Sequence, residues 1–445
     1  MPANRRSAWA RVGIVVLILG CGGGTRAYGF AGGTGEPNNP YQIATAADLL
    51  AIGSDRNLLD KHFVLMNDID LDPNLPGGRV FDDALIARDE SEGVSGHAGD
   101  PFRGVLDGRG HSIRNLQISG KYGYDAALFG KLSGLVQDLH LQDVRISGSP
   151  CGALAGLNER GLILRCSVTG RISGAEETGG LVGVNWDGSL MDCRADVQVT
   201  GTKNVGGMVG GGPGGTLIRC ELRGDIHGDS AVGGLVGELR QGQIVDSRAA
   251  GTVAGTDYVG GLVGDMAMAA SILRSTADCD VTAEQTAGGL AGNAALFAPH
   301  GQLVADCYAR GSVAGSITGG LIGNASDVRI VNCYAACEMI PAASPAATSS
   351  TTAVGGLWGN ADAHSPPLVT GCFWDVELSN VHVGAGSGPG HYGTGLTTQQ
   401  MQQRDAFQQA KWDLGYTWAM PENDYPVLQW EPARAESPKT DADSQ

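Results

Sequence analysis

The sequence predicts an all-β fold, a right-handed parallel β-helix (a solenoid) of about nine coils with small α/β caps at both ends. Three observations predict it: a Gly-rich segment that recurs at a nearly constant spacing, an unusual composition, and short apolar runs separated by Gly, Asn or Asp. Gly accounts for 71 of 445 residues but Pro for only 18, with no triplet period, which excludes collagen. Hydrophobic residues at 42% suffice for a core, and aromatic residues at only 6% favour thin stacked strands over packed helices.

The repeated segment is Gly-Gly-Leu-Val-Gly or a close variant. It begins at Gly179, Gly206, Gly233, Gly260, Gly288, Gly319 and Gly355. Weaker copies lie at Gly152–Gly156 and Ala127–Gly130, and the central residues of the nine copies are 26 to 36 residues apart, most often 27. A unit of this length cannot bury its own apolar face, so we expect coils to stack about 4.8 Å apart around a continuous core. Parallel strands joined by such crossovers wind right-handedly.

Each unit follows a fixed order, which residues 190–210 illustrate. An apolar pair, a charged residue and Cys193 come first, Val197 and Val199 then alternate with polar residues, and the next Gly-rich segment begins at Gly206. This pattern predicts about three short strands in each unit. We expect the glycines to permit positive φ and close backbone approach at the bends.

Residues 1–29 are predicted to be an export signal. Arg5, Arg6 and Arg11 precede an apolar run, residues 12–19, that is too short to span a membrane. Two processing routes stay open: Ile18–Cys21 resembles a bacterial lipobox, in which Cys21 is lipidated, whereas the small residues of Ala27–Gly29 suit ordinary signal peptidase. We therefore expect an exported protein of the cell envelope or surface, or an extracellular one.

The ends of the solenoid need covers. Residues 30–101 are predicted to form an N-terminal cap and an acidic loop, in which strands at 41–43, 62–65 and 69–71 accompany a helix at 45–52. Residues 102–378 hold the repeats and residues 379–430 form the C-terminal cap. There we expect a helix beginning at Thr397 and a hydrophobic plug built from Trp412, Trp418 and Trp430. Residues 431–445 are predicted to be disordered.

Three insertions interrupt the repeats, at residues 77–101, 338–353 and 379–395, the last with His382 and His391. We interpret them as tolerated surface insertions. Ligand binding is the alternative, because loops on a rigid scaffold often carry binding sites.

The repeats resemble a known family. Gly-Gly-Leu-Val-Gly followed by Gly-x-Ile-x-x-Cys is similar to the GLUG-motif repeats of bacterial surface proteins, which also occur beside the catalytic part of some IgA-specific metallopeptidases. Residues 102–118 resemble that family's entry segment, and the resemblance covers about residues 30–430. It implies a β-helix at the cell surface but no single biochemical activity.

The cysteines recur at one position of the repeat, where Ser247 and Ser275 replace them in two coils. The predicted core column is Cys166, Cys193, Cys220, Cys307, Cys333 and Cys372. Strand spacing places their Cβ atoms about 4.8 Å apart, beyond the ~3.8 Å that a disulfide favours, so we expect buried free thiols. Cys279 and Cys337 occupy a Gly position instead, and a disulfide or metal site joining Cys333 and Cys337 is the alternative.

The residue before each core-column position alternates in charge. The predicted ladder is Arg165, Asp192, Arg219, Asp246, Arg274 and Asp306, followed by Asn332. Coils in register bring each Arg one strand spacing from an Asp, whereas a slip by one coil would juxtapose like charges. We expect this ladder to specify register more than bulk stability, because exposed pairs contribute only about 0.2–1 kcal/mol.

Metal and catalytic candidates are few. Asp68, Asp70 and Asp72 alternate on one predicted strand and, with nearby Asp82, Asp83 and Asp89, form a weak candidate site for Ca²⁺. A solvated acidic edge is the interpretation we favour. Asp107 and His111 flank Gly108 and Gly110, and we interpret them as a turn with its hydrogen-bond partner in place of a catalytic pair.

The charge balance and the missing motifs narrow the function. A net charge of −17 disfavours nucleic acid as a partner. No His is followed by Glu, so no His-Glu-x-x-His site exists, and the nucleophile elbow and the phosphate-binding loop are also absent. We expect a non-enzymatic surface scaffold for adhesion that needs no cofactor and binds an extracellular glycan or surface protein, with membrane contact only through a lipid anchor. The alternative is a polysaccharide lyase or glycoside hydrolase of the β-helix type.

Overall fold

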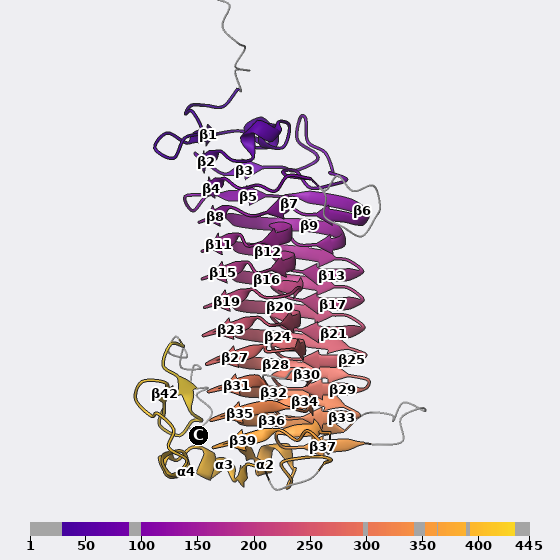
Figure 1. The fold of residues 1–445 in the computed structure, drawn as a ribbon, viewed down its shortest axis with the longest axis vertical. Helices are drawn as coiled ribbons and strands as arrows, with labels where there is room; N and C mark the ends of the chain where they lie inside the picture. Colours follow the sequence, from indigo (N-terminus) through magenta and orange to yellow (C-terminus); the bar gives the residue numbers. More distant parts are fainter. Residues whose placement is uncertain are drawn as a thin grey trace, which may run out of the picture.

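A computed structural model describes residues 29–88, 99–296, 301–341, 352–362, 364–388 and 392–431. Residues 1–28, which include Cys21 and nearly all of the predicted export signal, lie outside the described residues, as do Asp89, His391 and the tail from residue 432. The described chain forms an elongated stack of coils with the N-terminal cap at one end (Figure 1). It is a parallel β-solenoid, as the sequence predicts.

The coils build three sheets of parallel strands. Sheet 1 has twelve: β1 (Tyr41–Ile43), β2 (His62–Leu65), β4 (Val105–Asp107), β8 (Leu135–Gln137), β11 (Leu162–Leu164), β15 (Ser189–Met191), β19 (Thr216–Ile218), β23 (Gln243–Val245), β27 (Ser271–Leu273), β31 (Gln302–Ala305), β35 (Val328–Val331) and β39 (Leu368–Thr370). Sheet 3 has nine: β7 (Phe129–Leu132), β10 (Ala155–Glu159), β14 (Val182–Trp186), β18 (Val209–Gly211), β22 (Val236–Arg240), β26 (Val263–Ala267), β30 (Ala291–Leu296), β34 (Ile322–Ala325) and β38 (Trp358–Asn360). Eight full turns separate the first and last strands of sheet 3.

Sheet 2 lies between the other two along the chain and takes two strands from each regular coil. One series of its strands is long in the regular coils and shorter at both ends of the solenoid: β3 (Ile69–Asp70), β5 (Ser112–Arg114), β6 (Gln117–Ala126), β9 (His140–Cys151), β12 (Ser167–Ser173), β16 (Arg194–Thr200), β20 (Glu221–His227), β24 (Arg248–Gly255), β28 (Thr276–Ala283), β32 (Tyr308–Gly315), β36 (Tyr334–Pro341), β40 (Phe373–Asp375) and β41 (Thr394–Leu396). Its short strands are β13 (Glu176–Gly179), β17 (Lys203–Gly206), β21 (Ser230–Gly233), β25 (Asp257–Gly260), β29 (Thr286–Gly288), β33 (Ile317–Gly319) and β37 (Ala353–Gly355). A regular coil therefore has four strands and not three, because the segment before each Gly-rich motif divides into two strands.

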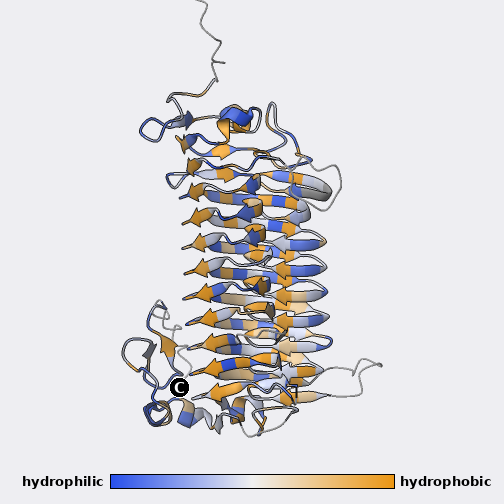
Figure 2. Cartoon of the chain, viewed as in Figure 1, coloured by the Kyte–Doolittle hydropathy of each residue, from blue (hydrophilic) through white to orange (hydrophobic). Residues whose placement is uncertain are grey.

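Pairing is in register, so each repeat position becomes a column. Leu190 pairs with Ile163 in the preceding coil and with Leu217 in the next. The central residues of the motif, from Leu128 to Leu357, are all fully buried. Figure 2 shows hydrophobic residues at matching places in successive strands of sheet 1.

The last glycine of the motif lets two sheets meet through their backbones. A Cβ on Gly237 of β22 would lie 2.4 Å from the nitrogen of Val205 and 2.5 Å from the carbonyl carbon of Asn204, both in β17 of the preceding coil. Gly210 and Gly264 have the same surroundings in neighbouring coils. The expected positive φ is found at other repeat glycines, Gly170, Gly251 and Gly311, whereas these motif glycines have ordinary φ values. The close approach of backbones is what requires glycine.

The N-terminal cap matches its prediction closely. Helix α1 (Ala46–Ile52) begins after Thr45, whose hydroxyl accepts from the Asp48 backbone while the Asp48 carboxylate accepts from the Thr45 backbone. This reciprocal cap satisfies backbone donors at the helix start. A short 3₁₀ turn, Arg56–Leu58, follows before β2.

The C-terminal segment differs from its prediction. Trp358 is fully buried and Trp374 nearly so, and these two close the apolar core at the end of the solenoid. The helices α2 (Val376–Ser379), α3 (Thr398–Met401), which is capped by Thr397, and α4 (Arg404–Gln409) follow the last regular coil. The prediction that Trp412, Trp418 and Trp430 form a plug at the end of the solenoid is wrong in its location.

These three indoles lie on the flank of the solenoid. Their Nε1 atoms donate to the Gly371 carbonyl (2.8 Å), to the Asp306 carboxylate (3.2 Å) and to the Arg274 carbonyl (2.9 Å), in successively earlier coils. The segment, which includes the hairpin of β42 (Trp418–Ala419) and β43 (Val427–Leu428), thus runs back beside the lower coils (Figure 1). Indole N–H groups need acceptors when buried, and the corners of the coils present them.

Replacing Gly237 by Ala tests the backbone contact. The added methyl would overlap backbone atoms that cannot rotate away, so we expect a loss of about 1–3 kcal/mol in the free energy of unfolding. Urea denaturation measures it. Gly415→Ala is the control, because nothing lies within 4 Å of its added Cβ. Equal stability of the two variants would contradict the proposed contact.

Candidate functional site

The outer face of sheet 2 carries regularly spaced polar residues. In β16 every second residue is exposed and the others are buried, so Arg194, Asp196 and Gln198 point outward. In-register pairing stacks outward residues of successive coils. One such column contains His140, Ser167, Arg194, Glu221, Arg248, Thr276, Tyr308, Tyr334 and Phe373.

The lower part of this face is covered by the C-terminal segment. Arg310 is buried, its guanidinium lies 4.8 Å from the Tyr308 ring centroid and 5.2 Å from that of Tyr425, and it donates to the Tyr334 hydroxyl at 2.7 Å. The Tyr334 hydroxyl in turn donates to the Pro426 carbonyl at 2.7 Å. These contacts hold the segment on the lower coils of the sheet, whereas β12 to β24 keep exposed outward residues.

A depression of about 370 Å³ lies on the β12 to β24 part of this face. Its lining residues are Ser167, Val168, Thr169, Arg194, Ala195, Asp196, Glu221, Arg223 and Arg248. Glu221 is ion-paired to Arg248, and both side chains are largely buried. The Arg223 and Arg194 guanidinium Nε atoms lie farther from the Glu221 carboxylate, at 3.4 and 3.6 Å, and their side chains are 67% and 76% exposed.

This cluster was not among the predicted site residues. The signal was present, because Arg194, Glu221 and Arg248 follow one another at intervals of 27 residues, the period of the repeat. Residues that recur at one repeat position form a surface site only if that position points outward. The sequence did not reveal which positions of the repeat point outward.

The predicted charge ladder forms discrete pairs. Arg219 donates two hydrogen bonds to Asp192, at 2.6 and 2.8 Å, and Arg274 binds Asp246 in the same way. Arg165 binds Asp138, which was not among the predicted ladder residues and whose coil has Leu139 at the cysteine position. Each Arg contacts the Asp of the preceding coil, and Asn332 contacts Asp306. All of these residues have left-handed φ, near +50°, so they also form the corner between sheets 1 and 2.

The six cysteines of the core column lie in the interior, where the structure records them as free thiols. Each Sγ donates to the carbonyl two residues earlier, as Cys193 does to Met191 at 3.3 Å. In several coils the column's backbone N–H donates to the next coil's side chain, as from Cys220 to the Ser247 hydroxyl at 3.0 Å. Cys279 and Cys337 are also free, and burial raises the pKa of the Cys337 thiol to about 12.

The acidic candidates are occupied by local hydrogen bonds. Asp68 binds Arg114 at 2.5 Å and lies 3.5 Å from His111 Nδ1. Asp70 accepts from Asn115 and from the backbone of Asp72, whose own carboxylate accepts from Asn74. Within the described residues, no three His, Cys, Asp or Glu side chains gather as a metal ion would require.

Other neighbouring candidates also have local roles. The Asp107 carboxylate accepts from the Arg109 backbone within its turn. Asp83 accepts from the Ala84 backbone, and burial raises its pKa, whereas Asp82 is exposed. His382 is exposed in the described part of its insertion.

Buried carboxylates line the contact between sheet 3 and the short strands of sheet 2. Asn204 donates to Glu177 at 3.0 Å and to Glu238 at 3.2 Å. Asp265 follows Glu238 in the same column, and burial raises the pKa of Asp265 to about 6, although Asn293 donates to it at 2.8 Å.

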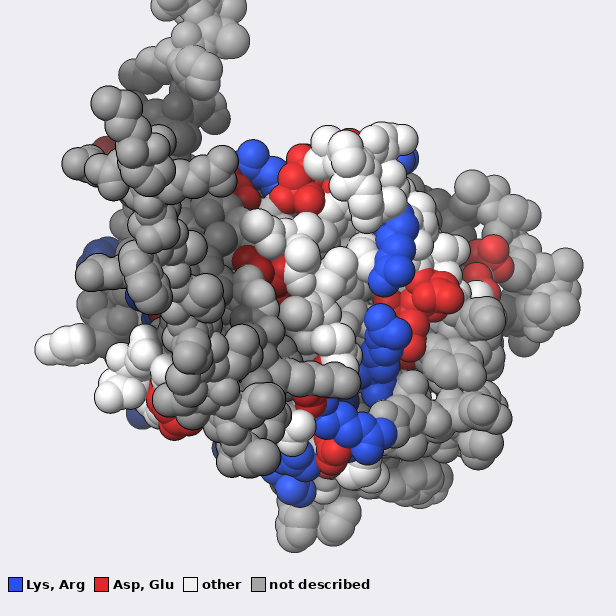
Figure 3. Space-filling view, turned by 90° about the horizontal axis from the view of Figure 1, so that it is seen from above, with Lys and Arg blue, Asp and Glu red and all other residues white. Residues whose placement is uncertain are grey.

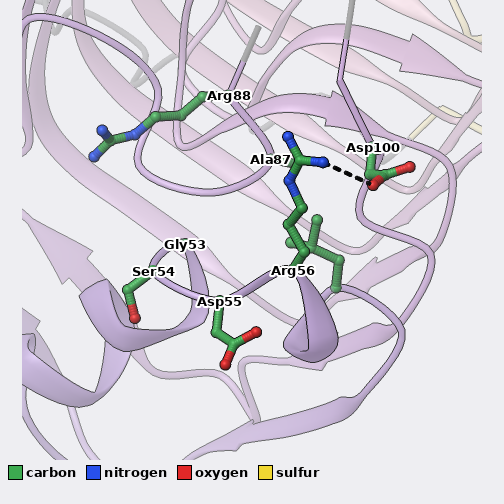
Figure 4. Close-up of a pocket in the computed structure, with 8 residues that line it drawn as sticks. Gly53, Ser54, Asp55, Arg56, Ala87, Arg88 and Asp100 are labelled. Atoms are coloured by element: carbon green, nitrogen blue, oxygen red, sulfur yellow. Dashed lines mark ion pairs between the residues drawn. The ribbon is translucent and has the colours of Figure 1, made fainter. Parts of the chain in front are cut away.

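A second cavity, of about 190 Å³, lies in the N-terminal cap. Figure 4 shows Arg56 reaching toward Asp100, 3.9 Å away, while Arg88 extends away from both. On the end of the molecule seen in Figure 3, basic and acidic side chains interleave and do not form a patch of one sign. The described residues visible there therefore show no concentration of one sign of charge that would favour one class of ligand.

Fold and site together define a class: an elongated parallel β-solenoid whose repeats present one ordered, polar sheet face. The predicted GLUG motif is confirmed, since the model of that motif matches residues 174–200. In the described residues we find no helix with the length and apolarity that a membrane crossing requires.

Two relatives cover part of the chain. Halomucin of Haloquadratum walsbyi is 31% identical over 157 residues, 34% of this chain and 2% of its own length. A protein of Evansella cellulosilytica, provisionally named a Gly-rich membrane protein, is 36% identical over 148 residues, 31% of this chain and 15% of its own. The chain therefore spans only a small part of the relatives it matches. A solved structure from Bacteroides ovatus, provisionally named an immunoglobulin A1 protease, covers 91% of this chain and 96% of its own with 17% identity and a TM-score of 0.44.

Removing an arginine of the ladder tests its contribution. Arg219 holds the pKa of Asp192 below its usual value, so the pair stabilises the fold above about pH 4 and loses its effect as pH falls through the lowered pKa. We expect Arg219→Met to lower the free energy of unfolding by about 0.2–1 kcal/mol at pH 7 and by less at pH 2. Denaturant titrations at both values measure this. A difference of the same size in acid would assign the effect to packing of the arginine stem.

The buried carboxyl of Asp265 predicts the opposite pH dependence. Its pKa is higher in the folded chain than in the unfolded one, so its ionisation lowers stability as pH rises from about 4 to 6, with no further change above. Asp265→Asn keeps the acceptor for Asn293, and we expect a gain of up to about 2 kcal/mol at pH 7. Thermal unfolding at pH 4 and 7 tests this, with the exposed Asp187→Asn as control. A loss of stability at pH 7 would contradict it.

Proposed function

We propose that this protein is an exported, non-enzymatic surface scaffold that binds an extended extracellular ligand, a glycan or a surface protein, along the outer face of sheet 2. The observation that carries the proposal is the in-register column of outward polar residues on β12, β16, β20 and β24. Adjacent strands lie about 4.8 Å apart, so the face offers polar groups at a fixed interval along a rigid rod. A ligand that has its own linear repeat can contact these polar groups on several successive coils.

The charges on this face support binding over catalysis. Glu221 is surrounded by three arginines, and Arg248 occupies its carboxylate directly. Acid–base cleavage of a glycoside needs two carboxyl groups available to the substrate. On this face the central carboxylate, that of Glu221, is instead ion-paired with arginines.

The location at the cell surface, by secretion or by a lipid anchor on Cys21, is supported by the names of the two relatives and by the apolar N-terminal run. A polysaccharide lyase is the second candidate. Asp196 together with Arg194 and Arg223 in one depression favours it, because basic and acidic groups converge there.

Site-specific blocking of the face tests the proposal. Because the described cysteines are buried, an engineered surface cysteine can be labelled selectively with a bulky maleimide. We expect the labelled full chain with Arg171→Cys, on sheet 2, to lose binding to its ligand in a panel of acidic and neutral polysaccharides and intact cells, with and without Ca²⁺. Asp187→Cys, exposed between sheets 3 and 1, should keep it when labelled.

The same panel separates scaffold from enzyme. Binding without release of fragments supports the proposal. Fragment release that Asp196→Asn or Glu221→Gln abolishes would overturn it in favour of the lyase, and equal binding by both labelled variants would place the ligand elsewhere. Wild-type chain treated with the reagent reports any labelling at native cysteines.

A further inference from the structure

We infer that the depression around Glu221 is a subsite for an acidic glycan, whose carboxylate or sulfate groups Arg194 and Arg223 bind. This inference rests on the proposed function, because it assigns a ligand class to the same face. Three arginines, Arg194, Arg223 and Arg248, line this depression on sheet 2.

The depression reverses the sign of the protein's charge. The chain as a whole carries −17, yet this lining holds three arginines against Asp196 and Glu221, a local balance of +1. An anionic polymer is repelled by most of the surface and attracted here, which favours a specific contact over general adsorption. Nucleic acid would need many more phosphate contacts than two exposed arginines provide.

Glu221 orients Arg194 and Arg223 but does not occupy all of their hydrogen-bond donors. Its carboxylate is occupied by Arg248, whose side chain is only 25% exposed. Arg194 and Arg223 approach the same carboxylate at 3.6 and 3.4 Å, longer than a good hydrogen bond, so most of their N–H donors face solvent. Each guanidinium is thus oriented and still able to bind a carboxylate or sulfate through two N–H groups.

Hydroxyl groups complete the subsite. Ser167 and Thr169 of β12 line the wall next to Arg194. The Ser167 hydroxyl is 2.8 Å from His140 Nδ1, and the Thr169 hydroxyl accepts from the Asp143 backbone, so both are held in place. Oriented hydroxyls suit the hydroxyl groups of a sugar, which both donate and accept. Charge and hydroxyl groups one coil apart therefore match a chain that alternates acidic and hydroxyl groups.

Binding of the full chain to three polymers tests the inference: polygalacturonate, dextran sulfate and neutral dextran. We expect binding to one or both acidic polymers, weakened by salt, and a loss of at least about tenfold in affinity in the double variant Arg194→Ala/Arg223→Ala. Arg194→Lys/Arg223→Lys should recover part of it. The matched control is Arg160→Ala/Arg329→Ala, which removes the same charge from exposed positions off sheet 2.

The outcomes separate the two proposals. Preference for polygalacturonate identifies a carboxylate ligand, and preference for dextran sulfate a sulfated one. Equal loss in the control variant would reduce the effect to net charge and overturn the inference. Binding to neutral glycans or to cells, blocked by the label at Arg171→Cys but unchanged in Arg194→Ala/Arg223→Ala, would overturn the acidic-glycan inference and leave the proposed function standing. If the label blocks no binding, both fail.

Discussion

The close approach of two backbones fixes the architecture of this solenoid. Gly237 lies where a side chain would collide with the β17 backbone, and its equivalents Gly210 and Gly264 repeat the contact. Because interiors are close-packed, such a contact leaves no freedom for a coil to shift sideways against its neighbour. The recurring Gly-rich motif is therefore a steric requirement for flat stacking, and it explains why its period equals the length of a coil.

Because the register is constant, the residues at one repeat position form a column, and each column has a different structural role. The interior column of Cys and Ser satisfies backbone groups at a corner, since its Sγ or Oγ atoms accept from one coil and donate to a nearby carbonyl. The adjacent Asp and Arg column occupies the left-handed bend itself. Aspartate tolerates that conformation well, whereas arginine does not favour it, so the bidentate pair with the preceding coil helps to hold each Arg there.

The sequence predicted the coils, the interior cysteines and the alternating charges, because each depends on a residue type that recurs at the repeat period. The helix of the N-terminal cap was predicted from its local sequence pattern instead. The sequence failed where contacts join segments far apart in the chain. Trp418 and Trp430 have no periodic partner, so nothing in the sequence showed that they reach Asp306 and Arg274 on the flank. The candidate site was missed for a related reason: the column of Arg194 and Glu221 is visible as a spacing, but which face it occupies depends on how the long segment divides between the strands of sheet 2.

The C-terminal segment determines which part of the outer face of sheet 2 is accessible. Tyr308 and Tyr334 occupy the same column as Arg194 and Glu221, yet their rings pack against Trp418 and Tyr425. The column is aromatic where it is covered and charged where it is accessible, as expected if burial selects the residue at each coil. Arg310 lies under the C-terminal segment and is nevertheless charged. Its buried guanidinium contacts tyrosine rings and a tyrosine hydroxyl, which take the place of water. The arginines of the accessible coils have no such cover, and their charge remains available to a ligand.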